Sequence, residues 1–203
     1  MPNWCSNNIR VSGPDAALNE FAEWLDDGNN LLNKILPTPK ELADAQSPFK
    51  GTKEEGAALA AKYGVNNWYD WNIHNWGTKW DVEADVQQND GEISLTFDSA
   101  WSPPQRAIAL LAEKFNDLSF HHAYLEEGMC FVGYDDYEGG VLIDEFYSDD
   151  TDSDEWKEVA ADEFGWEPWE NDEDELEENE EGKVTEVPKP MEDDEDEVKA
   201  EAK

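Results

Sequence analysis

The sequence has few basic residues and lacks long apolar runs. Its 14 Lys and Arg stand against 51 Asp and Glu, which gives a formal net charge of -37. This charge repels nucleic-acid phosphates and anionic lipid headgroups, so we expect neither direct nucleic-acid binding nor a membrane contact. No segment approaches the ~20 apolar residues of a membrane helix, and no signal-peptide pattern opens the sequence. A cytoplasmic protein is therefore expected.

The sequence signatures of common catalytic and metal sites are also missing. There is no Gly-rich phosphate loop, no Gly-x-Ser-x-Gly elbow and no His-Glu-x-x-His pair. Cys5 and Cys130 lie far apart in apolar, strand-like contexts, which predicts two buried, reduced thiols. His121 and His122 are neighbours on a predicted strand and point to opposite faces, so they cannot bind one ion together. We expect no catalytic residue, no metal site and no cofactor.

Acidic residues are spread over the whole chain. Residues 147–203 hold 26 Asp and Glu against 5 Lys, and residues 1–146 hold 25 against 9 Lys and Arg. Aromatic residues make up 12% of the sequence, far more than a disordered acidic chain carries, so a folded core is expected before the acidic run that opens at Glu170. Because this core is itself anionic, a binding partner is expected to be basic.

The order of the predicted elements indicates a ferredoxin-like β-α-β-β-α-β sandwich of the α+β class. Residues 89–91 (Asn-Asp-Gly) turn the central hairpin, and Ser102 and Gln105 are predicted to cap the second helix as N-cap and capping-box residue. The predicted elements are a strand over 4–11, a helix over 18–25, a hairpin over 80–98, a helix over 102–115 and a strand over 118–125.

Three further segments are predicted around this sandwich. Residues 29–79 form an insertion with one Ala-rich helix over 53–62. A second hairpin over 129–146, turned at 138–140, completes a domain over residues 1–147. Residues 148–169 form an acidic helix packed on the core, with Ser153 as its cap and Gly165 as its end. Residues 170–203 are expected to be a disordered acidic tail.

Four separated motifs carry a resemblance to a known family. They are residues 1–8 (MPNWCSNN) with Gly13-Pro14, residues 76–81 (WGTKWD), residues 97–104 (FDSAWSPP), and residues 126–129 (EEGM) with Phe131 and Gly133. Over about residues 1–147 the chain resembles the YubB-type ferredoxin-like domain family of phage and plasmid proteins. The resemblance implies the fold and a mobile-element origin, and it brings no established activity or catalytic residues.

Carboxylates face outward on the predicted central hairpin, where single-strand RNA readers with the same element order carry aromatic residues. Carboxylates fixed on a folded surface can take the place of DNA phosphates in the basic groove of a DNA-binding protein. We therefore expect a non-enzymatic accessory protein that binds a basic partner, such as a host nuclease or restriction component, as a DNA mimic. The expected contact residues are Glu83, Asp85, Asp98, Glu126, Glu127, Asp135, Asp136, Asp149, Asp150, Asp152, Asp154 and Glu155. In the competing interpretation the acidic surface only keeps the protein soluble.

The Trp-rich segment over residues 68–81 supports an alternative function, and an enzyme of unknown chemistry is a third hypothesis. Its aromatic rings could line a pocket for a small ligand or a peptide, with polar groups that orient the ligand. The residues of this predicted pocket are Trp71, His74, Trp76, Lys79 and Trp80. In the structural interpretation, the same tryptophans cover the open edge of the sheet and each stabilise the fold by ~3 kcal/mol or more.

Overall fold

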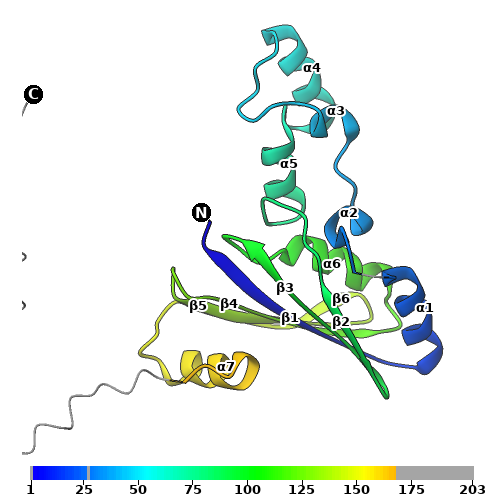
Figure 1. Ribbon diagram of the computed structural model, residues 1–203, viewed down its shortest axis with the longest axis vertical. Helices are drawn as coiled ribbons and strands as arrows, with labels where there is room; N and C mark the ends of the chain where they lie inside the picture. Colours follow the sequence, from blue (N-terminus) through cyan, green and yellow to red (C-terminus); the bar gives the residue numbers. More distant parts are fainter. Residues whose placement is uncertain (1, 27, 168–203) are drawn as a thin grey trace, which may run out of the picture. The chain divides into compact units, whose positions relative to one another are not determined.

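The computed structural model describes residues 2–26 and 28–167, and its framework is a six-stranded antiparallel sheet (Figure 1). The strands are β1 (Trp4–Ser12), β2 (Asp85–Asn89), β3 (Glu92–Ala100), β4 (Ser119–Glu126), β5 (Phe131–Glu138) and β6 (Val141–Ser148). They lie in the order β2-β3-β1-β4-β5-β6. The first four strands have the ferredoxin-like arrangement, and the β5–β6 hairpin extends the sheet beyond β4. The predicted fold class is confirmed.

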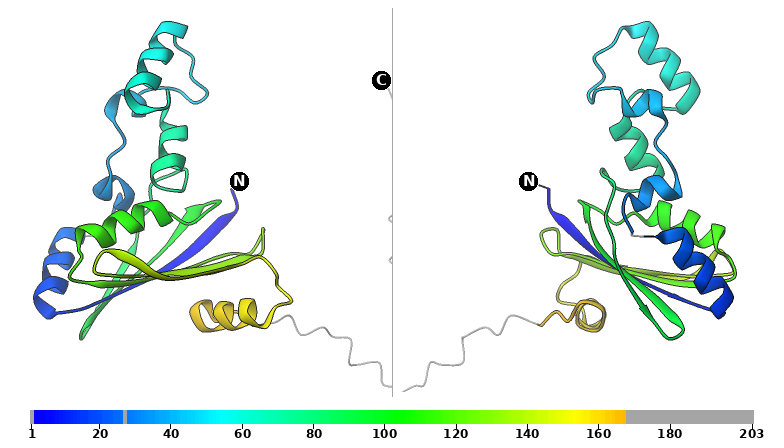
Figure 2. Two further views of the ribbon diagram at one scale, coloured as in Figure 1. Left: turned by 180° about the vertical axis from the view of Figure 1, so that it is seen from behind. Right: turned by 45° about the vertical axis from the view of Figure 1, so that its right-hand side comes forward.

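Helices α1 (Asp15–Leu25) and α6 (Gln105–Lys114) cover one face of the sheet (Figure 2). Alternate residues of β1, from Cys5 to Val11, are buried on this face. Phe21 of α1 packs edge to face against Phe115 and Phe120, with ring centroids 5.1 and 5.7 Å apart. The main hydrophobic core therefore lies between the sheet and these two helices.

Helix α7 (Asp154–Phe164) packs against the opposite face of the sheet, as Figures 1 and 2 show. Its boundaries agree with the prediction from sequence. The Ser153 hydroxyl accepts a hydrogen bond from the Trp156 backbone N–H, and Gly165 ends the helix in the left-handed conformation that glycine tolerates best. Residues 168–169 of the predicted acidic segment and the predicted disordered tail at 170–203 lie outside the described residues.

The insertion between α1 and β2 contains more helix than the sequence predicts. The predicted helix over 53–62 is α4 (Lys53–Tyr63), which begins with a capping box formed by Thr52 and Glu55. The structure adds α2 (Leu31–Ile35), α3 (Lys40–Ala43) and α5 (Trp68–Asn75). These three helices are short, so none repeats an apolar face often enough to stand out in the sequence. Within the described residues, no helix has the length and apolar character needed to cross a membrane.

Three local predictions are wrong, and those for Ser102 and Gln105 fail because both side chains form hydrogen bonds with distant residues instead of capping the helix. Pro104 occupies the N-cap position of α6, while the Ser102 hydroxyl donates to the Gly77 carbonyl at 2.6 Å. The Gln105 amide points away from the helix start and donates to the Asp135 carboxylate at 2.9 Å. Cys130 is exposed rather than buried, since it lies in the loop between β4 and β5, whereas Cys5 is buried as predicted.

Candidate partner-binding site

Apolar side chains hold α7 on the open face of the sheet. Trp156 and Ala160 of α7 are buried against Leu125 of β4 and Val132 of β5. The Trp156 indole N–H donates to the Cys130 carbonyl at 3.0 Å, and its ring packs edge to face against Trp166 at 4.9 Å. These contacts hold α7 on the sheet, so the fold sets the backbone positions from which its outer acidic side chains project.

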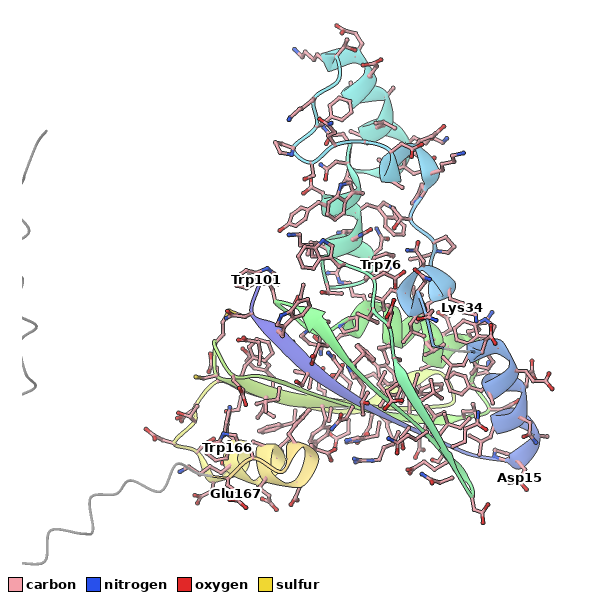
Figure 3. All side chains as sticks on the ribbon, in the orientation of Figure 1. Asp15, Lys34, Trp76, Trp101, Trp166 and Glu167 are labelled. Carbon is pink, nitrogen blue, oxygen red and sulfur yellow. The ribbon has the colours of Figure 1, made fainter. Side chains whose placement is uncertain are left out.

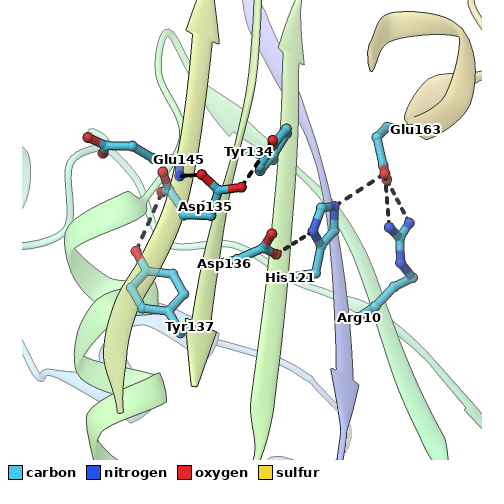
Figure 4. Close-up of polar contacts among 9 residues, drawn as sticks. Arg10, His121, Tyr134, Asp135, Asp136, Tyr137, Glu145 and Glu163 are labelled. Atoms are coloured by element: carbon cyan, nitrogen blue, oxygen red, sulfur yellow. Dashed lines mark hydrogen bonds and ion pairs between the residues drawn. The ribbon is translucent and has the colours of Figure 1, made fainter. Parts of the chain in front are cut away.

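A charged group, here called the Glu163 cluster (Arg10, His121, Asp136 and Glu163), ties the end of α7 to the strands (Figure 4). The Arg10 guanidinium donates to both Glu163 oxygens at 2.6 and 2.9 Å. His121 pairs with Glu163 through Nε2 at 3.2 Å and with Asp136 through Nδ1 at 2.6 Å. The pKa of His121 is raised, chiefly by Glu163, and the pKa of Glu163 is lowered to about 2, first by His121 and then by Arg10. The cluster therefore favours charged forms of both groups.

The outer face of α7 and the segment before it form an acidic ridge of exposed carboxylates. Five members were predicted from the sequence, and Glu158 and Asp162 were not. The ridge comprises Asp149, Asp150, Asp152, Asp154, Glu155, Glu158 and Asp162. Residues 149–163 contain a single basic residue, Lys157, and Glu163 is the one carboxylate among them that turns inward to the sheet. The negative charge of the ridge is therefore almost uncompensated by basic residues of residues 149–163.

The predicted sheet carboxylates lie on the same side of the sheet as α7. Asp98 of β3 stands opposite Ser6 of β1 and accepts a hydrogen bond from its hydroxyl at 3.1 Å. Asp85 of β2 stands opposite Thr96 and is exposed, as is Glu83 just before the strand. A hollow of about 480 Å³ lies between Asp98 and the end of α7 at Phe164. Acidic groups therefore border both sides of this hollow.

Two of the predicted contact carboxylates are buried, so the structure removes them from the contact surface. Glu126 is 1% exposed and accepts from the backbone N–H groups of Gly128 and Met129, which shapes the loop after β4. Asp135 is 2% exposed and accepts from Gln105 and the Tyr137 hydroxyl. Burial raises the pKa of the Asp135 carboxyl. Strand alternation predicts which face these residues share, but not which helix or loop covers them.

The other two carboxylates near the second hairpin differ in exposure. Glu127 is exposed in the loop after β4. Asp136 is half-buried, and its carboxylate is engaged by His121. Only Glu127 is thus a fully accessible contact residue in this part of the surface.

The structure does not bring the five residues of the predicted tryptophan pocket together. Trp71 and Trp76 belong to the main core, and the Trp76 indole donates to the Leu36 carbonyl at 2.9 Å. His74 is exposed, whereas Lys79 lies over the Trp80 ring with its Nζ 4.0 Å from the centroid. A hollow of about 280 Å³ does border Trp76 and Trp80, but its lining includes neither Trp71 nor His74.

Exposed aromatic residues that the sequence reasoning missed lie at one end of the sheet. Trp4 opens β1, and Trp101 directly follows β3, where Figure 3 labels it. Both side chains are exposed. The exposure of Trp4 could have been predicted from the sequence, because strand alternation places Trp4 on the polar face of β1 with Ser6 and Asn8.

The histidines do not form a metal site. His121 and His122 point to opposite faces of the sheet, as predicted, and His122 is fully buried with Nε2 3.0 Å from the Asn7 amide oxygen. Over residues 2–26 and 28–167, no group of three or more His, Cys, Asp or Glu side chains is placed to bind a metal ion.

Comparison with known proteins identifies the family of the chain. The ferredoxin-like domain in Api92-like protein matches residues 75–187. The chain belongs to this family. The uncharacterized protein YubB of Escherichia coli (strain K12) is 34% identical over 110 residues, which span 50% of this chain and 75% of YubB. The crystal structure of api92 from Yersinia pseudotuberculosis is 12% identical with a TM-score of 0.48, covering 73% of this chain and 98% of that one.

Family membership and the identity with YubB confirm the YubB-type ferredoxin-like domain predicted from the four motifs, whereas the predicted phage or plasmid origin stays a prediction. Three of these motifs lie within the matched residues, and the matched range includes the strands from β2 to β6 and the whole of α7. The family match supports the fold, whereas a function has to be argued from the surface of this chain.

Proposed function

We propose that the protein is a non-catalytic binding module that docks a basic, DNA-handling protein through the acidic ridge of α7 and the neighbouring sheet carboxylates. One observation carries the proposal: α7, which bears four of the seven ridge carboxylates, is docked on the sheet by Trp156 and by the Glu163 cluster. A solvating surface does not need fixed carboxylates, whereas a surface that replaces DNA phosphates does, because a partner's basic groove has fixed positive positions.

The spacing of the ridge suits this role. Asp154 and Glu158 are four residues apart on α7, so they lie on one side of the helix with a rise of about 6 Å between them. Asp98 and Asp85 add carboxylates from the sheet on the same side of the molecule. A partner that contacts these residues meets negative charge from three separate elements.

The test is competition between the protein and duplex DNA for the same partner. The full chain is immobilised, exposed to Escherichia coli lysate at low salt, and eluted with a short duplex DNA. Bound DNA-handling proteins that are released by duplex DNA, and by raising the salt from about 50 to 200 mM, support the proposal. Proteins that stay bound through both treatments contradict it.

A matched pair of variants locates the contact. Asp154→Asn with Glu158→Gln removes two ridge charges and should weaken capture about two- to fivefold per carboxylate. Glu20→Gln with Glu23→Gln removes two exposed charges from α1, on the other face of the sheet, and should leave capture unchanged. Equal losses in both variants would show that net charge alone, rather than the ridge, attracts the partner.

A further inference from the structure

Four exposed apolar side chains gather at the end of the sheet where β1 begins. Trp4, Trp80, Trp101 and Met129 are 51, 39, 43 and 51% exposed, and we call them the aromatic end patch. They come from the start of β1, the loop before β2, the residue after β3 and the loop after β4. Isolated surface tryptophans are unremarkable, but a group of large apolar side chains on a strongly charged protein indicates an interaction surface.

Contacts given by the structure link these four segments. The rings of Trp4 and Trp80 are 6.1 Å apart between centroids. The Trp101 backbone N–H donates to the Asn3 carbonyl at 3.0 Å, directly beside Trp4. A Cβ placed on Gly128 would lie 2.5 Å from the Asn3 amide, so the loop that carries Met129 packs at the same place. The four segments that carry these side chains therefore meet at one end of the sheet.

The backbone of Trp101 is held in a conformation that a bulky residue rarely adopts. Its φ is 72°, in the left-handed region that favours glycine. The neighbouring residues hold this turn in place: the Thr78 hydroxyl donates to the Ala100 carbonyl at 2.9 Å, and the Ser99 hydroxyl donates to the Ser102 carbonyl at 2.9 Å. A strained residue that exposes a large apolar side chain indicates a role for that side chain at the surface.

The surroundings of the patch favour a cation. Lys79 places its ammonium 4.0 Å from the Trp80 ring centroid and 5.9 Å from that of Tyr69, so a cation already stacks on one indole at this end, and Trp4 and Trp101 remain exposed. Asp98 lies on the same face of the sheet as Trp4, one alternate position beyond Ala100, which pairs with Trp4. Glu127 is exposed in the loop that carries Met129.

We propose that the aromatic end patch binds arginine side chains of the basic partner, with guanidinium groups stacked on Trp4 and Trp101 and paired with Asp98 and Glu127. This proposal rests on the proposed function and specifies arginine as the side chain with which the partner binds the patch. A guanidinium is planar, weakly hydrated and able to stack and to pair with a carboxylate at once, whereas a lysine ammonium keeps its water. A second copy of this chain is a poor occupant, since both copies carry a net charge of -37.

The experiment compares octa-arginine with octa-lysine as probes of the full chain. Binding is followed by the indole N–H signals in ¹⁵N NMR spectra and by calorimetry. Carboxylates attract both peptides, so tighter binding of octa-arginine than of octa-lysine measures the contribution of the tryptophans. We expect octa-arginine to bind several-fold more tightly and to shift the signals of Trp4, Trp80 and Trp101, while the buried Trp76 stays unshifted.

Substitutions then show which side chains cause the preference for octa-arginine. Trp4→Ala and Trp101→Gly should each weaken octa-arginine binding about two- to fivefold and leave octa-lysine binding unchanged. Trp101→Gly suits the left-handed backbone, so this variant retains the fold. Tyr147→Ala is the control, because Tyr147 is 60% exposed on β6, outside the patch, and its loss should change neither affinity.

The outcomes separate this inference from the proposed function. Equal affinity for the two peptides, together with unaffected binding in the tryptophan variants, overturns the arginine site. In that case the ridge proposal stands only if Asp154→Asn with Glu158→Gln weakens the binding of both peptides. Absence of peptide binding at low salt overturns both proposals.

Discussion

At the scale of single residues, His121 and His122 show how different surroundings shift the pKa values of adjacent histidines in opposite directions. Burial lowers the pKa of His122 to about 3, with protonated His121 adding to the effect, whereas the contact with Glu163 raises the pKa of His121. A lowered histidine pKa makes the unfolded state take up the proton first as the pH falls. Stability linked to His122 is therefore lost below pH 6.5, and stability linked to His121 is lost as the pH rises through its raised pKa.

This contrast gives a pH prediction. Relative to wild type, His122→Gln should lose less stability as the pH falls from 6.5 toward 3, because glutamine has no proton to take up. His121→Gln should differ from wild type most below pH 6.5, where the charged imidazole contributes. Urea unfolding over a pH series measures both differences. Identical slopes in wild type and in His122→Gln would contradict a neutral, buried His122.

The backbone of Trp101 gives a second residue-scale prediction. Alanine and glycine both remove the indole, but only glycine adopts a φ of 72° without strain. Trp101→Gly should therefore be more stable than Trp101→Ala by about 1–2 kcal/mol, measured by urea unfolding. Gly91 occupies a turn with a φ of 82°, and Gly91→Ala is the matched control that should lose a similar amount relative to wild type. Equal stability of the two Trp101 variants would mean that residue 101 is unstrained.

At the scale of elements, α7 depends on contacts that are separate from the main core. Its apolar face meets Leu125 and Val132, and its end is held by the Glu163 cluster. Sequence predicted the helix correctly from Ser153 and Gly165, since these capping residues act within the segment itself. The partner of Glu163 was not predictable, because Arg10 lies more than a hundred residues earlier in the chain.

Loss of the Glu163 carboxylate should loosen α7 without unfolding the sheet. Glu163→Gln removes the carboxylate that pairs with Arg10 and one of the two carboxylates that pair with His121, at a cost of about 1–3 kcal/mol to the docking of the helix. Hydrogen exchange should accelerate in α7 and stay slow in β1 and β4. Lys157→Gln is the control, because the Lys157 ammonium donates to the Asp152 carbonyl of its own segment and not to a strand that the structure describes. Acceleration across the whole sheet would show that α7 and the core unfold as one unit.

At the scale of the whole molecule, self-repulsion follows from the net charge of -37. Repulsion among carboxylates opposes the compact state, and added salt screens it. The free energy of unfolding should therefore increase when NaCl is raised from about 20 to 300 mM, although exposed pairs such as Lys62 with Glu41 weaken. Urea unfolding at both salt concentrations measures this change. A decrease would mean that attractive ion pairs outweigh the repulsion.

The sequence by itself determined the features that depend on neighbouring residues or on composition. The turn over residues 89–91 and the ends of α7 at Ser153 and Gly165 are encoded in short segments, and the order of the strands with α1 and α6 follows from apolar periodicity. The anionic character of the surface follows from the composition alone.

Only the tertiary structure decided which side chains from distant segments meet. Glu126 and Asp135 are buried by a loop and by Gln105, while Trp4 and Trp101 come together at an exposed end of the sheet. A carboxylate buried by hydrogen-bonded partners and one exposed on a ridge have the same sequence signature. Their environments differ because burial depends on the packing of the whole fold, to which a local pattern contributes only the face of the strand.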